Sequence, residues 1–172
     1  MSLNYFQLFD LPETFAITPA KLEAQYRQLQ STAHPDRFVT ATAAEQRQSM
    51  QLATLANEAY LTLTNPAKRA HYLLTLKGVD ALNESNTSLP MDFLMQQMEW
   101  REAMAEAIAA KDVASLDALY NSMQAAAKRL VIELTEQMDT KKDYAAASES
   151  TRKLVFIDKV CTDIAQAIER LD

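Results

Sequence analysis

Glycine is almost absent from this chain, in which Gly78 is the only glycine among 172 residues. Tight hairpin turns and β-bulges usually need glycine, because it adopts positive φ angles at little cost. The abundant residues are instead Ala, Leu, Gln, Glu, Met and Lys, most of which have high helix propensity. The sequence therefore predicts an all-α fold.

Breaks in the apolar pattern predict where these helices begin and end. Capping signals help to set the ends, such as Thr18 before Pro19 at the first helical position. The expected helices cover residues 19–33, 42–63, 67–76, 91–110, 112–138 and 143–171. Long helices joined by short turns pack as antiparallel neighbours. We therefore expect a helical hairpin with short flanking helices in the first part of the chain and an up-down-up three-helix bundle in the second.

The segment 77–90 marks the boundary between the two parts. It contains Gly78 and a polar run over residues 83–88, a composition typical of loops. We predict one domain of residues 1–76, a linker of residues 77–90 and a second domain of residues 91–172. Two arrangements stay open. The linker is flexible in one, and in the other Leu73, Leu74 and Leu76 dock the two parts together.

Periodic apolar residues predict a core for each part. In the hairpin, the first helix has one apolar face with i, i+4, i+7 spacing, made of Leu22, Tyr26 and Leu29. The residues expected opposite are Met50, Leu52, Leu55, Ala59 and Leu63. The last helix has a row of the coiled-coil type, made of Leu154, Ile157, Cys161, Ile164, Ile168 and Leu171. Its counterparts on the preceding helix are Leu116, Leu119, Met123, Leu130 and Leu134.

Charge is distributed unevenly along the chain, whose formal net charge is −6. Residues 1–76 contain six Lys or Arg and six Asp or Glu, whereas residues 77–172 contain eleven and seventeen. Phosphate contacts need clustered Lys and Arg. The acidic second part is therefore a poor candidate for nucleic-acid binding.

Several other protein classes also lack support in the sequence. No stretch approaches the roughly 18 apolar residues that a membrane span needs, and residues 1–17 lack the features of a signal peptide. The lone Cys161 allows no internal disulfide, suits a reducing cytoplasm and fits a packed core thiol. One cysteine and two histidines cannot supply four zinc ligands, no paired cysteine spacing exists for an iron–sulfur cluster, and there is no glycine-rich phosphate loop. We expect no cofactor, no metal and no catalytic residues, and thus a function in recognition.

The tripeptide His34-Pro35-Asp36 lies between the two helices of the predicted hairpin. Proline disfavours the α region at the residue before it, so the first helix should end near Ala33 or His34. The side chains of His34 and Asp36 are then presented on a tight loop. A helical hairpin needs a breaker in any case, so the tripeptide alone does not establish a binding function.

The surrounding sequence resembles the J domain of DnaK-type co-chaperones. The matching blocks span about the first 75 residues. They are Tyr5-Phe6-x-Leu8-Phe9-x-Leu11-Pro12, the helix with Leu22, Tyr26, Arg27 and Leu29, the tripeptide with Arg37, and Ala56-Asn57-Glu58-Ala59-Tyr60-x-x-Leu63-x-x-Pro66-x-x-Arg69-Ala70-x-Tyr72. Arg37 stands where Lys is commoner and Ala33 where an aromatic residue is common. Tyr72 is followed by Leu73 rather than Asp, and these departures favour a specialised J protein.

The helix expected at 91–110 has two apolar faces. At about 100° per residue, one face forms a core stripe of Phe93, Gln97, Trp100, Met104 and Ile108. The second face holds Leu94, Met95 and Met98 and is edged by Glu99, Glu102 and Glu106. On the last helix, Phe156 lies about 100° from the apolar row. Apolar clusters with a charged rim are typical of interaction surfaces, although these residues could instead dock the first domain or widen the core.

The second part resembles the C-terminal domain of the HscB family, the J-type co-chaperones of iron–sulfur cluster assembly. The match lies in Phe93-Leu94-Met95-x-Gln97-x-Glu99-x-Arg101-Glu102 and Arg152-Lys153-Leu154-x-Phe156-x-Asp158-Lys159. The resemblance implies two partners, the DnaK-type chaperone HscA and the scaffold protein IscU. The implied chaperone-binding residues are Tyr26, Arg27, His34, Pro35, Asp36 and Arg37. The implied scaffold-binding residues are Leu94, Met95, Met98, Glu99, Glu102, Glu106 and Phe156.

Two other functions remain to be separated from this one. A general J protein would deliver unfolded clients and would have a flexible or peptide-binding C-terminal region. A hydrolase that used His34 and Asp36 would need a nucleophile, for which the sequence has no signature.

Overall fold

The computed structural model describes residues 2–83 and 88–172, apart from the side chains of Pro35 and Phe38. All regular structure in these residues is helical, so the predicted all-α fold is confirmed. The chain divides into two compact units, one up to Leu73 and one from Leu74 onward. This division falls three residues before the predicted end of the first domain. Residues 84–87 of the predicted polar run lie outside the described residues.

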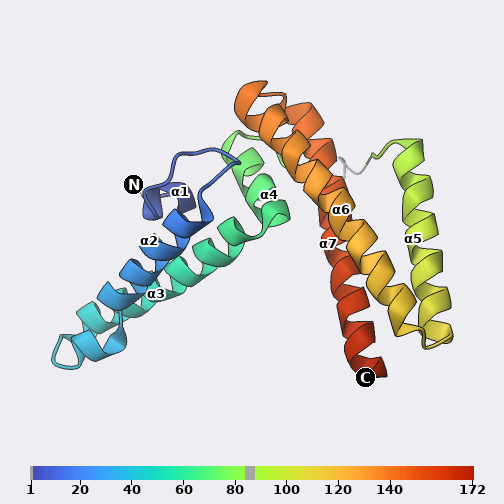
Figure 1. Ribbon diagram of the computed structural model, residues 1–172. Helices are drawn as coiled ribbons and strands as arrows, with labels where there is room; N and C mark the ends of the chain where they lie inside the picture. The colour runs from blue at the N-terminus through green and yellow to red at the C-terminus, as the bar shows by residue number, and fades with distance from the viewer. Residues whose placement is uncertain (1, 84–87) are drawn as a thin grey trace. The chain divides into compact units, whose positions relative to one another are not determined.

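The first unit is built around an antiparallel pair of helices, α2 (Pro19–Thr32) and α3 (Ala43–Thr64), which lie side by side in Figure 1. The short helix α1 (Tyr5–Leu8) precedes them, and α4 (Pro66–Leu76) follows. Thr18 is the N-cap residue of α2 as expected, but its side chain makes no capping hydrogen bond. Thr42 does cap α3, since its Oγ1 accepts the Glu45 N–H at 3.2 Å.

The face that α3 buries agrees only in part with the predicted one. Met50 and Leu55 were expected to face α2, but they are 63% and 36% exposed. The buried residues of α3 are Ser49, Ala56, Ala59 and Leu63. Ala59 and Leu63 are buried as predicted, whereas elsewhere the buried residue is a small neighbour of the expected one, Ser49 beside Met50 and Ala56 beside Leu55. Small side chains allow α2 and α3 to lie close together.

Arg69 of α4 joins three segments of the first unit from a buried position. Its Nε donates to the Phe15 carbonyl and its Nη1 to the Leu63 carbonyl, both at 2.7 Å. Its Cζ lies 4.6 Å from the centroid of the Phe15 ring. The guanidinium therefore holds α4 to the end of α3 and to the segment before α2.

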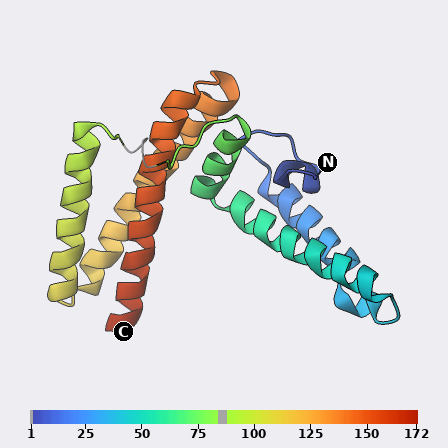
Figure 2. The ribbon, with the colours of Figure 1, turned by 180° about the vertical axis from the view of Figure 1, so that it is seen from behind.

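The second unit contains an up-down-up bundle of α5 (Met91–Ala109), α6 (Val113–Thr135) and α7 (Tyr144–Leu171), as predicted and as Figure 2 shows. Asp112 and Asp143 start α6 and α7, because their carboxylates accept the Ser115 and Ala146 N–H groups at 3.1 Å. Hydrogen bonds from Ser115 lower the pKa of Asp112. After Thr135 the chain continues in a π-helical turn, η2 (Glu136–Thr140), which the sequence did not predict.

Most of the predicted bundle core is buried. The fully or nearly fully buried members are Leu116, Met123, Leu130, Leu134, Leu154, Ile157, Cys161 and Ile164. Leu119, Ile168 and Leu171 are only half-buried. Ile108 was placed in the core stripe of α5, but it is 39% exposed and its neighbour Ala107 is buried instead. The expected stripe is therefore wrong at the end of α5, where the small Ala107 fits against the bundle.

The described part of the predicted linker is held on the second unit. The Arg152 guanidinium of α7 donates to the Ser88 carbonyl from Nη2 at 3.0 Å and from Nε at 3.2 Å. Its Nη1 also donates to the Ala81 carbonyl at 3.4 Å. Ala81 is fully buried, so the chain is fixed to α7 on both sides of residues 84–87.

Candidate functional site

His34 and Asp36 lie in the turn between α2 and α3. His34 has extended backbone angles, φ −63° and ψ 134°, as expected before proline. A short 3₁₀ helix, η1 (Pro35–Phe38), follows it. The side chains of His34 and Asp36 are 59% and 88% exposed. The tripeptide thus presents an imidazole and a carboxylate to solvent, as the sequence predicted.

Hydrogen bonds within the turn set the orientation of His34. Its Nδ1 accepts the Asp36 N–H at 3.2 Å, and its carbonyl accepts the Arg37 N–H at 3.0 Å. A nitrogen that accepts a hydrogen bond carries no proton, so neutral His34 has its N–H at Nε2. Nδ1 also lies 3.6 Å from the Asp36 Oδ2, a contact that becomes an ion pair when His34 is protonated. The turn therefore offers a partner one N–H donor, one carboxylate and the exposed Arg37.

The two predicted residues on α2 have different environments. Tyr26 is half-buried and its ring stacks on Tyr60 of α3, with centroids 4.0 Å apart. Its hydroxyl donates to the Asn57 Oδ1 at 3.1 Å. Arg27 is exposed and pairs with Glu23 one turn earlier, at 2.6 Å. Arg27 is thus open to a partner, whereas Tyr26 also packs α2 against α3.

The second predicted site is an exposed face of α5. Leu94, Met95 and Met98 are 39%, 58% and 63% exposed. Glu99, Glu102 and Glu106 are exposed as well. On a helix, Leu94 and Met98 form one row, and Met95 shares the next row with the three glutamates. We call these six residues, together with Phe156, the α5 face.

Phe156 of α7 lies in an aromatic cluster against α5. Its ring stacks on Trp100, with centroids 6.3 Å apart and planes 19° apart. It meets Phe93 edge-on at 6.1 Å, and the Arg101 Cζ lies 5.2 Å from its centroid. Phe156 therefore lies outside the apolar row of α7, as predicted, and its packing against α5 agrees with the alternative in which these residues widen the core. Its angle on α7 could not show that α5 carries two aromatic rings opposite.

Arg101 connects Phe156 to the exposed apolar row. It follows Met98 by three residues and Leu94 by seven, spacings that place all three on one side of a helix. Sequence reasoning did not include Arg101 in the site, although this spacing was a usable signal. The structure thus brings Phe156 next to the row of Leu94 and Met98 through the Arg101 contact.

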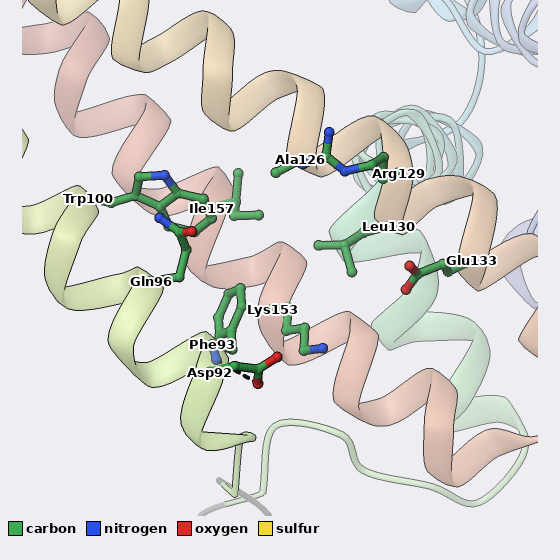
Figure 3. Close-up of a pocket in the computed structure, with 10 residues that line it drawn as sticks. All are labelled: Asp92, Phe93, Gln96, Trp100, Ala126, Arg129, Leu130, Glu133, Lys153 and Ile157. Atoms are coloured by element: carbon green, nitrogen blue, oxygen red, sulfur yellow. Dashed lines mark hydrogen bonds between the residues drawn. The ribbon is translucent and has the colours of Figure 1, made fainter.

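A cleft of about 430 Å³ lies where the three helices of the bundle meet. Figure 3 shows the residues that line it. They are Asp92, Phe93, Gln96 and Trp100 of α5, Ala126, Arg129, Leu130 and Glu133 of α6, and Lys153 and Ile157 of α7. The Lys153 Nζ lies 5.6 Å from the Phe93 ring centroid and 3.9 Å from the Glu149 carboxylate. The lining combines apolar side chains with charges of both signs, a surface that favours no single class of ligand.

Metal and nucleophile chemistry find no support in the described residues. Within residues 2–83 and 88–172, no group of His, Cys, Asp and Glu is arranged to hold a metal ion. In the same part of the chain, no helix is long and apolar enough to cross a membrane.

Burial raises the pKa of the Cys161 thiol, with a smaller opposing effect from the Gln124 hydrogen bond. A thiol held protonated is a poor nucleophile.

Similarity to known proteins extends over both units. The chain is 47% identical over 169 residues to the co-chaperone protein HscB homolog of Burkholderia thailandensis, covering 98% of this chain and 96% of that protein. This chain belongs to the HscB family of co-chaperones. Residues 89–165 also match the family described as the HSCB C-terminal oligomerisation domain.

Solved structures of HscB proteins have the same fold. The chaperone HscB from Vibrio cholerae is 35% identical, with a TM-score of 0.83 and coverage of 99% of this chain and 100% of that one. The human co-chaperone protein HscB is 28% identical, with a TM-score of 0.85 over 96% of this chain and 82% of that one. The HscB family consists of co-chaperones rather than enzymes, and a co-chaperone acts with an Hsp70-class chaperone. The resemblance to this family and the expectation of a non-enzyme are therefore confirmed.

Proposed function

We propose that this HscB-family protein stimulates the ATPase of the DnaK-type chaperone HscA and delivers the scaffold protein IscU to it. In this proposal, the turn at His34 binds the chaperone and the α5 face binds the scaffold. The domains would be residues 1–76 and 91–172, joined by residues 77–90. A protein with one reduced cysteine is suited to carry out this task in the cytoplasm.

One observation supports this proposal most strongly. Two exposed sets of side chains with different chemistry lie in different compact units. The turn at His34 is polar, whereas the α5 face combines exposed Leu and Met side chains with glutamates. Exposed apolar groups with a charged rim are typical of protein interaction sites, and Met adapts its shape to a partner. A co-chaperone that joins two partners needs two such surfaces.

Coupling between the two partners requires that this protein bind two arrangements of the chaperone with different affinities. The turn at His34 must bind the hydrolysis-competent arrangement of the chaperone more tightly than its resting arrangement, since equal binding would shift nothing. The scaffold on the α5 face is then tethered close to the chaperone, which raises its effective concentration. ATP hydrolysis takes place in the chaperone, and the HscB-family protein contributes binding energy only.

ATPase assays with purified HscA test this proposal. The full chain should raise the hydrolysis rate, and IscU together with the full chain should raise it further than either protein alone. A general J protein would instead stimulate HscA and DnaK alike and would show no dependence on IscU. Equal stimulation of both chaperones without an IscU effect would contradict the proposed function.

A further inference from the structure

Ser49 of α3 makes a buried hydrogen bond at the base of the His34 turn. Its Oγ donates to the Ala33 carbonyl oxygen at 2.6 Å, across sixteen positions of sequence. Both residues are buried, with exposures of 6% for Ser49 and 1% for Ala33. This bond therefore joins α3 to the end of α2 out of contact with water.

Ala33 is the last residue before the turn. It is the C-cap of α2, and its N–H donates to the Leu29 carbonyl at 3.0 Å. The last carbonyls of a helix have no partner within the helix, so the Ala33 carbonyl depends on a group from elsewhere. Ser49 supplies that group. Buried carbonyls are costly to leave unpaired, so the bond favours one orientation of the Ala33 peptide.

The orientation of that peptide determines where His34 lies. A peptide unit is planar, so a fixed Ala33 carbonyl also fixes the N–H and Cα of His34. His34 in turn accepts the Asp36 N–H at Nδ1 and the Arg37 N–H at its carbonyl. The Ser49 hydrogen bond, the Ala33–His34 peptide and the two hydrogen bonds of His34 thus connect α3 to the groups that the turn exposes.

We propose that Ser49 is a positioning residue for the His34–Asp36 turn, holding it ready for the chaperone through the Ala33 carbonyl. This inference rests on the proposed function for its effect on the chaperone, but its effect on the turn is a property of the free protein. Without the Ser49 hydroxyl, the turn samples other orientations and the competent one becomes a smaller fraction. Apparent affinity falls in proportion to that fraction.

Ser49→Ala tests the inference without a threat to the helix, because Ala has higher helix propensity than Ser. The concentration of the full chain that gives half-maximal HscA stimulation should rise roughly three- to tenfold, while the maximal rate is retained. His34→Gln should differ, since it removes a contacting group and abolishes the stimulation at every concentration. In the free protein, the Asp36 amide of Ser49→Ala should exchange faster by NMR, and the His34 ring nitrogens should shift.

Two further variants separate positioning from stability. Ser49→Thr keeps the hydroxyl and should restore the half-maximal concentration and the Asp36 amide protection. Thr64→Ala is a matched control, because Thr64 also donates its hydroxyl to a carbonyl on α3, that of Tyr60 at 2.7 Å, but far along the helix from the turn. It should leave both readouts unchanged.

The results also distinguish this inference from the proposed function. Normal Asp36 exchange and an unchanged half-maximal concentration in Ser49→Ala would overturn the inference. Equal losses of stability and stimulation in Ser49→Ala and Ser49→Thr would overturn it too, since the role would then be structural. Normal stimulation by His34→Gln would instead contradict the proposed function, and Asp36 exchange in the free protein would still decide whether Ser49 positions the turn.

Discussion

Arg101 lies over the ring of Phe156, with its Cζ 5.2 Å from the ring centroid. This contact between α5 and α7 joins the exposed Leu94 and Met98 to a ring that is itself half-buried against Trp100. The α5 face therefore has an exposed part, which a partner can cover, and an inner part, which also supports the bundle. Substitutions in the two parts should have different consequences.

Leu94→Ala and Met98→Ala should each weaken IscU binding by roughly 1–2 kcal/mol, the range of interface anchors. A loss of about 1.4 kcal/mol is about tenfold in affinity. The melting temperature should change little, because both side chains are exposed. Titration calorimetry and thermal melts on the same samples measure both effects. Full affinity in both variants would show that the α5 face does not bind the scaffold.

Phe156→Ala should lose both affinity and stability. Full truncation of a buried Phe costs about 3–5 kcal/mol, so a half-buried ring should cost roughly 2 kcal/mol of unfolding free energy. Urea unfolding gives this value directly. A variant as stable as the wild type would mean that the contacts with Phe93 and Trp100 contribute nothing to folding. Arg101→Gln is a useful comparison, since it removes the cation over the ring and leaves the ring in place.

Reversal of charge at Glu99, Glu102 or Glu106 to Lys should weaken IscU binding mainly at low salt. Charges at the edge of an interface act through attraction that ions screen over about 10 Å at 0.1 M salt. Binding measured at several salt concentrations should therefore converge with the wild type as salt rises. Glu169→Lys on α7, outside the predicted site, is the matched control. An effect of the same size in Glu169→Lys would indicate net charge rather than a local contact.

The helices were largely predictable from the sequence, and their packing was less so. Proline and capping residues such as Asp112 set the helix ends locally, so the predicted bounds agree with the structure to within a few residues. The choice between Met50 and Ser49 as the buried residue depends on how closely α2 approaches, which one helix cannot reveal. Phe156 shows the same limit, because its aromatic neighbours lie on another helix. The π-helical turn after Thr135 has no local sequence signal that we recognise.

A fragment of residues 77–172 should be more stable than a fragment of residues 91–172. The longer fragment keeps Ala81 and Ser88, whose carbonyls accept hydrogen bonds from Arg152. A hydrogen bond to a charged group contributes about 1.5–3 kcal/mol to the unfolding free energy. Because Ser88 is exposed, the expected difference in stability between the two fragments lies near the lower end of this range. Chemical unfolding followed by circular dichroism measures it. Equal stability of the two fragments would show that residues 77–90 are a free linker, and Arg152→Gln in the longer fragment tests the contact itself.

The Cys161 thiol should make the stability of the folded chain fall at alkaline pH. Burial raises the pKa of this thiol above its ordinary value, so the folded state favours the protonated form. This contribution is fully present below the ordinary thiol pKa of about 8.5 and is lost as pH rises toward the higher folded value. The difference in unfolding free energy between wild type and Cys161→Ala, followed across that pH range, isolates the effect. A difference that does not change with pH would contradict the raised pKa of the buried Cys161 thiol. Rapid reaction of the native thiol with a disulfide reagent at neutral pH would contradict it too.

The most direct test of the two-surface account is the HscA ATPase rate with His34→Gln and Met98→Ala, each measured with and without IscU. Both residues are exposed, so both variants should fold like the wild type. His34→Gln should abolish stimulation by this protein yet bind IscU with full affinity. Met98→Ala should stimulate HscA normally in the absence of IscU, and roughly 5- to 30-fold more IscU should be needed for the further increase that IscU brings. If His34→Gln stimulates like the wild type, or if either variant loses both activities while it stays folded, the assignment of one partner to each surface is wrong.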